Sequence, residues 1–88
     1  MDTTQPMSQL KEGQDAVVTC LELDGAIRRR LIDLGLMENT PVRCLQKSPW
    51  GDPAAYWIRG AVIALRREDS SRILVRPLPG EGGDQPWD

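Results

Sequence analysis

The sequence predicts a mainly β fold, in which about five short strands close into a small barrel and one short helix lies between the first and second strands. Five apolar stretches of five to nine residues alternate with glycine, proline and polar residues, a pattern typical of short strands joined by turns. One other stretch repeats its apolar residues at helical spacing. A body of this size buries only about 60% of its unfolded surface, so closure into a barrel, which leaves few edges exposed, is the favoured architecture.

The chain is expected to enter the barrel after a short N-terminal segment. Residues 1–8 are polar, contain a proline and show no periodicity, so we expect them to be disordered. The barrel domain is therefore predicted over residues 9–76. Its first strand is predicted over Asp15–Leu23, where β-branched and apolar residues dominate.

The helix is predicted between Asp24 and Gly35. Asp24 is expected at the N-cap, where its carboxylate can accept hydrogen bonds from free N–H groups of the first turn. Gly35 is expected just past the last turn with a positive φ, and Leu36 is expected to pack back on the helix. The apolar face consists of three residues at i, i+4 and i+7: Ile27, Leu31 and Leu34.

Four more strands follow the helix, and they are predicted over Thr40–Lys47, Ala54–Arg59, Ala61–Arg66 and Arg72–Arg76. Glycine, proline, asparagine and aspartate mark the turns, where positive φ or a fixed φ is needed. The predicted turn residues are Gly35, Asn39, Gly51, Asp52, Pro53 and Gly60. Residues 67–71 are predicted to form a polar turn or a single helical turn. Residues 77–88 are rich in proline, glycine and acids, and we expect a disordered tail.

The charge distribution limits the classes of partner. The chain has 88 residues and a net charge of −2, but residues 9–76 hold all 11 basic residues and nine of the 13 acidic ones. This body carries a net charge of +2, far less than a dedicated DNA-binding domain. No apolar run approaches the roughly 20 residues that span a bilayer, and the N-terminus does not resemble a signal peptide. The sequence therefore favours a cytoplasmic protein.

Candidate catalytic and metal-binding groups are sparse. Histidine is absent, and the two cysteines, Cys20 and Cys44, lie on different predicted strands. Two isolated cysteines do not supply the ligand set of a zinc site, and we expect two small buried thiols. No nucleophile–base pair and no phosphate-binding glycine motif is present. We expect no enzyme activity, no bound metal and no cofactor.

Three motifs, in order, resemble the FeoA family, the ferrous iron transport protein A. They are RRRLIDLGL at 28–36, GDP at 51–53 and RGAVIALRRE at 59–68. The resemblance covers roughly residues 7–76 and departs from the family pattern mainly at Glu38–Asn39, which stands in place of a proline–glycine pair. The resemblance implies a small SH3-like β-barrel, similar also to the barrel at the C-terminus of iron-dependent repressors.

The resemblance also implies a function. It indicates a cytoplasmic accessory or regulatory protein of bacterial ferrous iron uptake, found at the inner face of the membrane through its partner. That partner is expected to be the FeoB transporter, contacted at its cytoplasmic GTP-binding part. We expect a monomer or a weak dimer, and no nucleic-acid partner.

The predicted partner surface combines charge with apolar anchors. The consecutive arginines Arg28, Arg29 and Arg30 span most of a helical turn, so they cannot all be buried, and they can steer an acidic partner. Leu36 and Met37 can add an apolar spot, although contact with the core is the stronger expectation for both. Trp50, in a loop rich in proline and glycine, either folds over the core or is an exposed anchor.

Two other functions remain open from the residues alone. A nucleic-acid-binding barrel can use the basic residues and a stacking aromatic ring, namely Arg28–Arg30, Arg66, Arg67 and Trp57. A metal sensor can use Cys20 and Cys44. The low net charge disfavours the first and the small ligand set disfavours the second.

Overall fold

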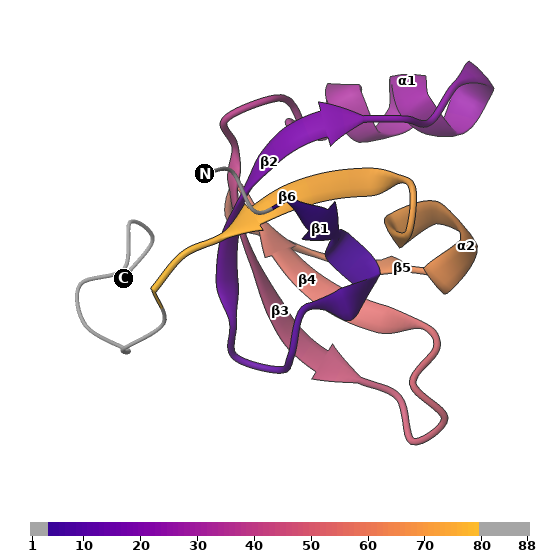
Figure 1. The fold of residues 1–88 in the computed structure, drawn as a ribbon. Helices are drawn as coiled ribbons and strands as arrows, with labels where there is room; N and C mark the ends of the chain where they lie inside the picture. Colours follow the sequence, from indigo (N-terminus) through magenta and orange to yellow (C-terminus); the bar gives the residue numbers. More distant parts are fainter. Residues whose placement is uncertain (1–3, 80–88) are drawn as a thin grey trace.

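The computed structural model describes residues 4–79 and has six strands. The strands are β1 (Gln5–Pro6), β2 (Asp15–Leu21), β3 (Pro41–Lys47), β4 (Ala54–Ile58), β5 (Ala61–Leu65) and β6 (Ile73–Pro77). The helices are a 3-10 turn η1 (Met7–Gln9), the main helix α1 (Gly25–Asp33) and the single turn α2 (Arg67–Ser70). The mainly β fold class is confirmed, with the short helix α1 between β2 and β3, and β1 is a strand that the sequence did not predict (Figure 1).

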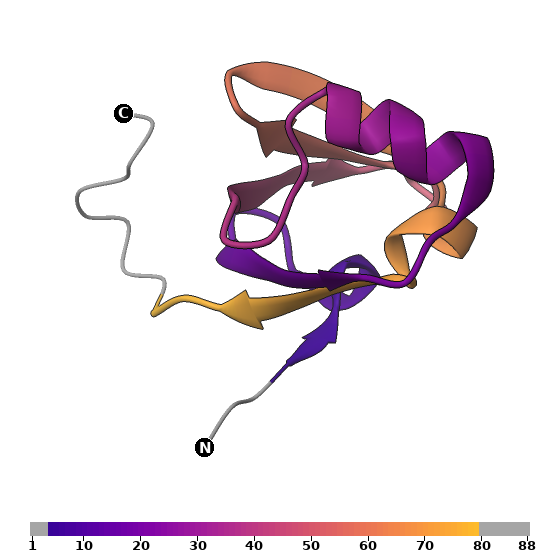
Figure 2. The ribbon, with the colours of Figure 1, turned by 90° about the horizontal axis from the view of Figure 1, so that it is seen from above.

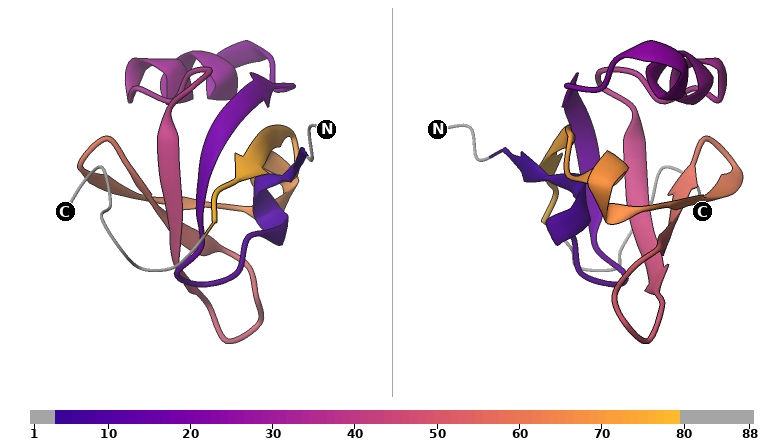
Figure 3. Two further views of the ribbon diagram at one scale, coloured as in Figure 1. Left: turned by 60° about the vertical axis from the view of Figure 1, so that its left-hand side comes forward. Right: turned by 90° about the vertical axis from the view of Figure 1, so that its right-hand side faces the viewer.

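All strands belong to one antiparallel sheet in the order β1-β6-β2-β3-β4-β5. The sheet curls around a common interior, and α1 lies across one end of it (Figure 2). The loop between β3 and β4 projects from the opposite end (Figure 3). Register shifts in β2, between Val18 and Cys20, and in β3, between Cys44 and Gln46, accompany the bending of these two long strands.

Alternation along the strands fills the interior. Val42 and Cys44 of β3 and Tyr56 and Ile58 of β4 are all essentially inaccessible to solvent. Helix α1 adds Leu31, with Ile27 half-buried against the same core. Leu34, the third residue of the predicted apolar face, is 40% exposed, because it lies at the C-cap where the chain leaves the core.

The two ends of the domain differ from expectation. Residues 5–9 are ordered against the barrel: β1 pairs with β6, and Met7 and Leu10 are fully buried. The prediction that residues 1–8 are disordered is therefore wrong for residues 5–8. At the other end, Pro77 belongs to β6, and the N–H of Leu78 donates to Asp15 O at 2.9 Å. Expectations for residues 1–3 and 80–88 lie outside the described residues.

The start of α1 is also a correction. Asp24 occupies the N-cap, as predicted, but its carboxylate makes no capping hydrogen bond. Gly25 follows with a φ of 69°, so the chain enters the helix through a left-handed residue and not through the regular geometry of a capped first turn.

The end of α1 follows the prediction closely. Gly35 has a φ of 101°, and its N–H donates to Ile32 O at 2.9 Å. The N–H of Leu36 donates to Leu31 O at 2.9 Å, which completes a Schellman motif, and Leu36 is fully buried. Asn39 adopts a φ of 71°, so the turn before β3 has the left-handed residue expected there.

Candidate functional site

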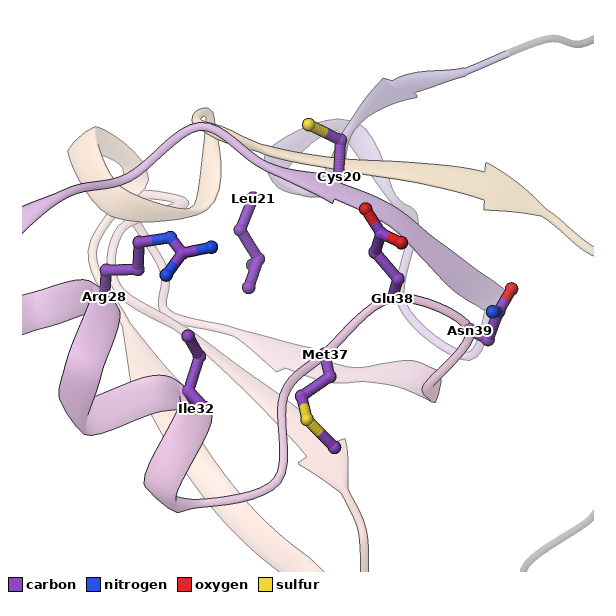
Figure 4. A pocket seen from close by; sticks show the side chains of 7 residues that line it. All are labelled: Cys20, Leu21, Arg28, Ile32, Met37, Glu38 and Asn39. Atoms are coloured by element: carbon purple, nitrogen blue, oxygen red, sulfur yellow. The ribbon is translucent and has the colours of Figure 1, made fainter.

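A large hollow lies between α1, the end of β2 and the loop that leads into β3. It has a volume of about 590 Å³. Its lining residues are Cys20, Leu21, Arg28, Ile32, Met37, Glu38 and Asn39 (Figure 4). The floor is apolar, with a guanidinium on the helix side and a carboxylate on the loop side. We call this hollow the α1 groove.

The α1 groove joins a second hollow of about 350 Å³ through two shared residues, Arg28 and Ile32. The second hollow extends toward the N-terminus of α1 and adds Arg29 and Asp24. Two of the three consecutive arginines therefore border one continuous depression. Arg30 lies on another side of the helix, where it lines a separate pocket with β5. The three arginines surround α1 and do not form a single patch.

The loop that presents Met37 and Glu38 is held by backbone and side-chain hydrogen bonds. The Thr40 hydroxyl accepts from the Met37 N–H at 3.0 Å and donates to Gly35 O at 3.2 Å. The N–H of Asn39 donates to Val18 O at 2.7 Å, which ties the loop to β2. Thr40 is itself fully buried. Such bonding keeps the wall of the groove in one conformation and lowers the entropy that a partner would lose by ordering it.

The predicted partner residues are distributed over different parts of the molecule. Arg28 and Met37 meet at the α1 groove, and Met37 is 45% exposed. Leu36 is fully buried, so the expected core contact is confirmed and its place among the partner residues is wrong. Trp50 is 87% exposed, which answers the question of its burial, but its loop lies at the opposite end of the barrel from α1 (Figures 1 and 3).

Sequence reasoning missed most of the groove. Ile32 lies four residues after Arg28 on the helix, so helical spacing was a usable signal for placing it beside the arginine. Glu38 and Asn39 were assigned only to a turn. Cys20 and Leu21 reach the groove because β2 passes under α1, and local sequence carries no signal for that packing.

The predicted turn residues take structural roles. Gly51 has a φ of 84°, and Asp52 Oδ1 accepts from the Arg67 N–H at 2.8 Å, which joins the β3–β4 loop to the start of α2. Arg59 and Gly60 form a two-residue hairpin turn with φ values of 52° and 85°. The GDP motif thus connects two elements of the fold.

The two cysteines differ in environment. Both are free thiols; Cys44 is fully buried and Cys20 is half-buried at the α1 groove. The expectation of two buried thiols therefore holds for Cys44 alone. Within residues 4–79, no cluster of three or more cysteine, aspartate and glutamate side chains is arranged to hold a metal ion. No helix in this range is long and apolar enough to cross a membrane.

A small antiparallel barrel with a helix across one end defines the SH3-like class of β-barrels. A manganese-dependent transcriptional repressor shares this fold, with a TM-score of 0.78 at 16% identity over 89% of this chain and 44% of that one. The model of the FeoA domain family matches residues 5–77. The chain belongs to the FeoA family, which is linked to ferrous iron transport, as the sequence motifs indicated.

Solved FeoA structures agree in sequence as well as fold. The FeoA protein from Chlorobium tepidum is 37% identical, with a TM-score of 0.82 over 90% of this chain and 75% of that one. The FeoA of Stenotrophomonas maltophilia, solved with zinc and described as possibly a ferrous iron transport activating factor, is 32% identical, with a TM-score of 0.68 over 83% of this chain and 88% of that one.

A relative from Porphyromonas gingivalis shows the domain in a larger context. This protein is a fusion of Fe(2+) transport protein A with the Fe(2+) transporter FeoB. It is 30% identical over 80 residues, which are 91% of this chain. The chain spans 10% of the length of this relative.

Proposed function

We propose that this protein is a cytoplasmic accessory protein of bacterial ferrous iron uptake, and that it acts by binding the GTP-binding part of a FeoB transporter. The observation that carries the proposal is the fusion in Porphyromonas gingivalis, where a homologous domain is joined covalently to FeoB. A covalent link holds the two parts of that relative at a high effective concentration, so the fusion supports a contact between a FeoA domain and FeoB.

The α1 groove is the contact surface we propose. Its apolar floor provides area to bury, and Arg28 provides a charge that accelerates encounter with an acidic surface. Met37 stands exposed on a loop that hydrogen bonds already hold in place. A flexible thioether on a fixed loop adapts to a partner at a small cost in backbone entropy.

Calorimetric titration against the soluble GTP-binding portion of FeoB from the same organism tests the proposal. It is performed with GDP and with a non-hydrolysable GTP analogue, at low and high salt. We expect saturable binding that weakens with salt, because exposed charges are screened. Arg28→Glu and Met37→Asp are each expected to weaken binding about tenfold or more, the loss of roughly 1.4 kcal/mol of contact energy.

The controls separate the surface from the function. Arg76→Glu changes an exposed arginine on β6, outside the groove, and is expected to leave affinity nearly unchanged. Trp50→Ala examines the opposite end of the barrel. Binding that survives both groove variants but is lost in Trp50→Ala would move the contact to that end. Absence of saturable binding in both nucleotide states would contradict the proposed function.

A further inference from the structure

Strand β5 is an unprotected edge of the sheet. In the order β1-β6-β2-β3-β4-β5, the two edge strands are β1 and β5. β1 has two residues, one of them Pro6, which has no N–H to offer. β5 has five residues and contains neither proline nor charge. Natural proteins normally protect such an edge with charges, prolines or bulges, so β5 is an exception that calls for a partner.

The register shows which backbone groups of β5 are unpaired. The N–H of Cys44 in β3 donates to Gln14 O, and its C=O accepts from the Gly13 N–H, so the backbone of Cys44 faces the β2 side. The backbone N–H and C=O of the preceding residue, Arg43, therefore face β4, where Arg43 is paired with Trp57. Along each antiparallel strand, the backbone N–H and C=O groups of successive residues point alternately toward one neighbouring strand and toward the other. Tyr56 of β4 therefore faces β5 and pairs with Ile63.

The same alternation carries across β5. With Ile63 directed toward β4, the N–H and C=O groups of Val62 and Ala64 point outward from the sheet. In the described part of the chain they accept or donate no hydrogen bond outside the sheet. Val62 is also 66% exposed, and Ala64 is exposed. Four backbone groups are thus available to one further strand.

A pocket lies beside this edge, between β5 and α1. Its volume is about 160 Å³, and it is distinct from the α1 groove on the other side of the helix. Apolar residues from both elements form most of its wall: Ile27, Leu31, Leu34, Ile63, Ala64 and Leu65. A cavity of similar size in another protein, roughly 150 Å³, accepts a benzene molecule. The pocket therefore has room for one apolar side chain of an incoming strand.

The charges around the edge favour an acidic occupant. Arg30 and Arg66 line the pocket, and Arg59 stands at the turn that begins β5. Asp69 is the acidic residue of the lining. A second copy of this chain is a poor occupant, because antiparallel pairing of two β5 edges brings the flanking Arg59 and Arg66 of both copies to the same edge. Like charges that lie close together across paired strands disfavour pairing.

We infer that the β5 edge binds an extended peptide segment of a partner protein as a seventh strand. The segment pairs with Val62 and Ala64, inserts an apolar side chain between α1 and β5, and carries carboxylates at both flanks that meet Arg30, Arg59 and Arg66. Strand addition of this kind draws affinity from the main chain and selectivity from alternate side chains. This site does not depend on the proposed contact at the α1 groove, since no residue lines both.

The test uses a synthetic peptide, acetyl-Glu-Asp-Val-Leu-Val-Asp-Glu-amide, added to the full ¹⁵N-labelled chain and followed by NMR. We expect saturable shifts on β5 and slowed hydrogen exchange at the amides of Val62 and Ala64. Val62→Pro removes one outward N–H at an edge where proline is tolerated, and it should weaken binding at least about fivefold, as expected for one lost hydrogen bond. Val62→Thr keeps that N–H and should retain affinity. Arg66→Glu and a peptide with lysine flanks should both bind more weakly.

Four outcomes would overturn the inference. The first is the absence of saturable shifts on β5 at millimolar peptide, and the second is an affinity that is unchanged in both Val62→Pro and Arg66→Glu. The other two are protection of the Val62 and Ala64 amides against hydrogen exchange when no peptide is present. Amide protection that grows with protein concentration would assign the edge to a second copy. Protection that is independent of concentration and is lost in a chain ending at Pro79 would assign it to residues 80–88. Because Arg28 and Met37 are untouched, failure here leaves the FeoB titration unaffected.

Discussion

At the scale of single residues, burial makes the two thiols chemically different. Burial raises the pKa of Cys44 above the usual value for a thiol. The positive charge of Lys47 opposes this effect and the negative charge of Glu12 adds to it. A raised pKa means less thiolate at any given pH, and the thiolate is the reactive form. Cys20 instead borders an open groove.

This difference predicts selective labelling. With iodoacetamide at pH 8, we expect the native protein to gain one adduct quickly, at Cys20. Cys44 is expected to react at least about a hundredfold more slowly, through opening of the barrel. Mass spectrometry of digests measures both sites, and Cys20→Ser provides the control, which should remain unlabelled until urea is added. Equal labelling rates at the two sites would contradict the burial of Cys44.

At the scale of elements, the end of α1 is coupled to the β4–β5 hairpin. The side chain of Arg59 lies over Gly35, and its Nε donates to Gly35 O at 3.4 Å. A Cβ added to Gly35 would stand 3.2 Å from the Cγ and Cδ atoms of Arg59. Glycine is therefore favoured at position 35 for two reasons: the backbone has a positive φ there, and the Arg59 side chain of the hairpin packs closely against it.

Gly35→Ala is expected to lower the free energy of unfolding by about 2 kcal/mol, combining backbone strain with displacement of Arg59. Gly13→Ala is the matched control, because Gly13 has a φ of 85° and open space around its Cα. That control should lose only about 1 kcal/mol, the strain alone. Urea denaturation measures both variants. If the two lose equal stability, the contact with Arg59 contributes nothing.

The sequence was sufficient for elements whose signals are local. Gly35 and Asn39 marked the end of α1 and the next turn because few residues tolerate positive φ. Strand bounds agreed to within one or two residues, since breakers separate the strands. The site was less accessible to such reasoning. Helical spacing placed Arg28 outside the core. It did not show which strand Arg28 would lie beside, although β2 ends only shortly before α1 begins, because the packing of the helix on the sheet decides that.

At the scale of the whole molecule, the N-terminal segment completes the core. Met7 and Leu10 are fully buried, and η1 contacts both β6 and α2. Local composition indicated disorder there, because the segment is polar and short. Tertiary contacts outweigh that tendency, since two apolar side chains find a partly built interior and β1 pairs with β6. The order of this segment could not be predicted from the sequence, because the elements it packs against, β6 and α2, lie far from it along the chain.

A chain that begins at Gln9 is therefore expected to lose at least about 2 kcal/mol of stability, the lower range for removing a buried methionine side chain. A chain that begins at Thr4 keeps every described residue and should match the full chain. Denaturant unfolding followed by circular dichroism makes the comparison. Equal midpoints for all three chains would show that Met7 and β1 contribute nothing to the fold.

The strand order also bears on synthesis. β6, the last of the described strands to be synthesised, pairs with β1 and β2, which are the first of them. The nascent chain therefore holds β1 without its neighbour, and β2 with only β3 beside it, until residue 77 has emerged. Contacts so distant in sequence slow folding, and here they cannot form before residue 77 has been synthesised. Until then, the sheet of β2, β3, β4 and β5 has two open edges, one at β2 and one at β5, and a chaperone can meet either of them.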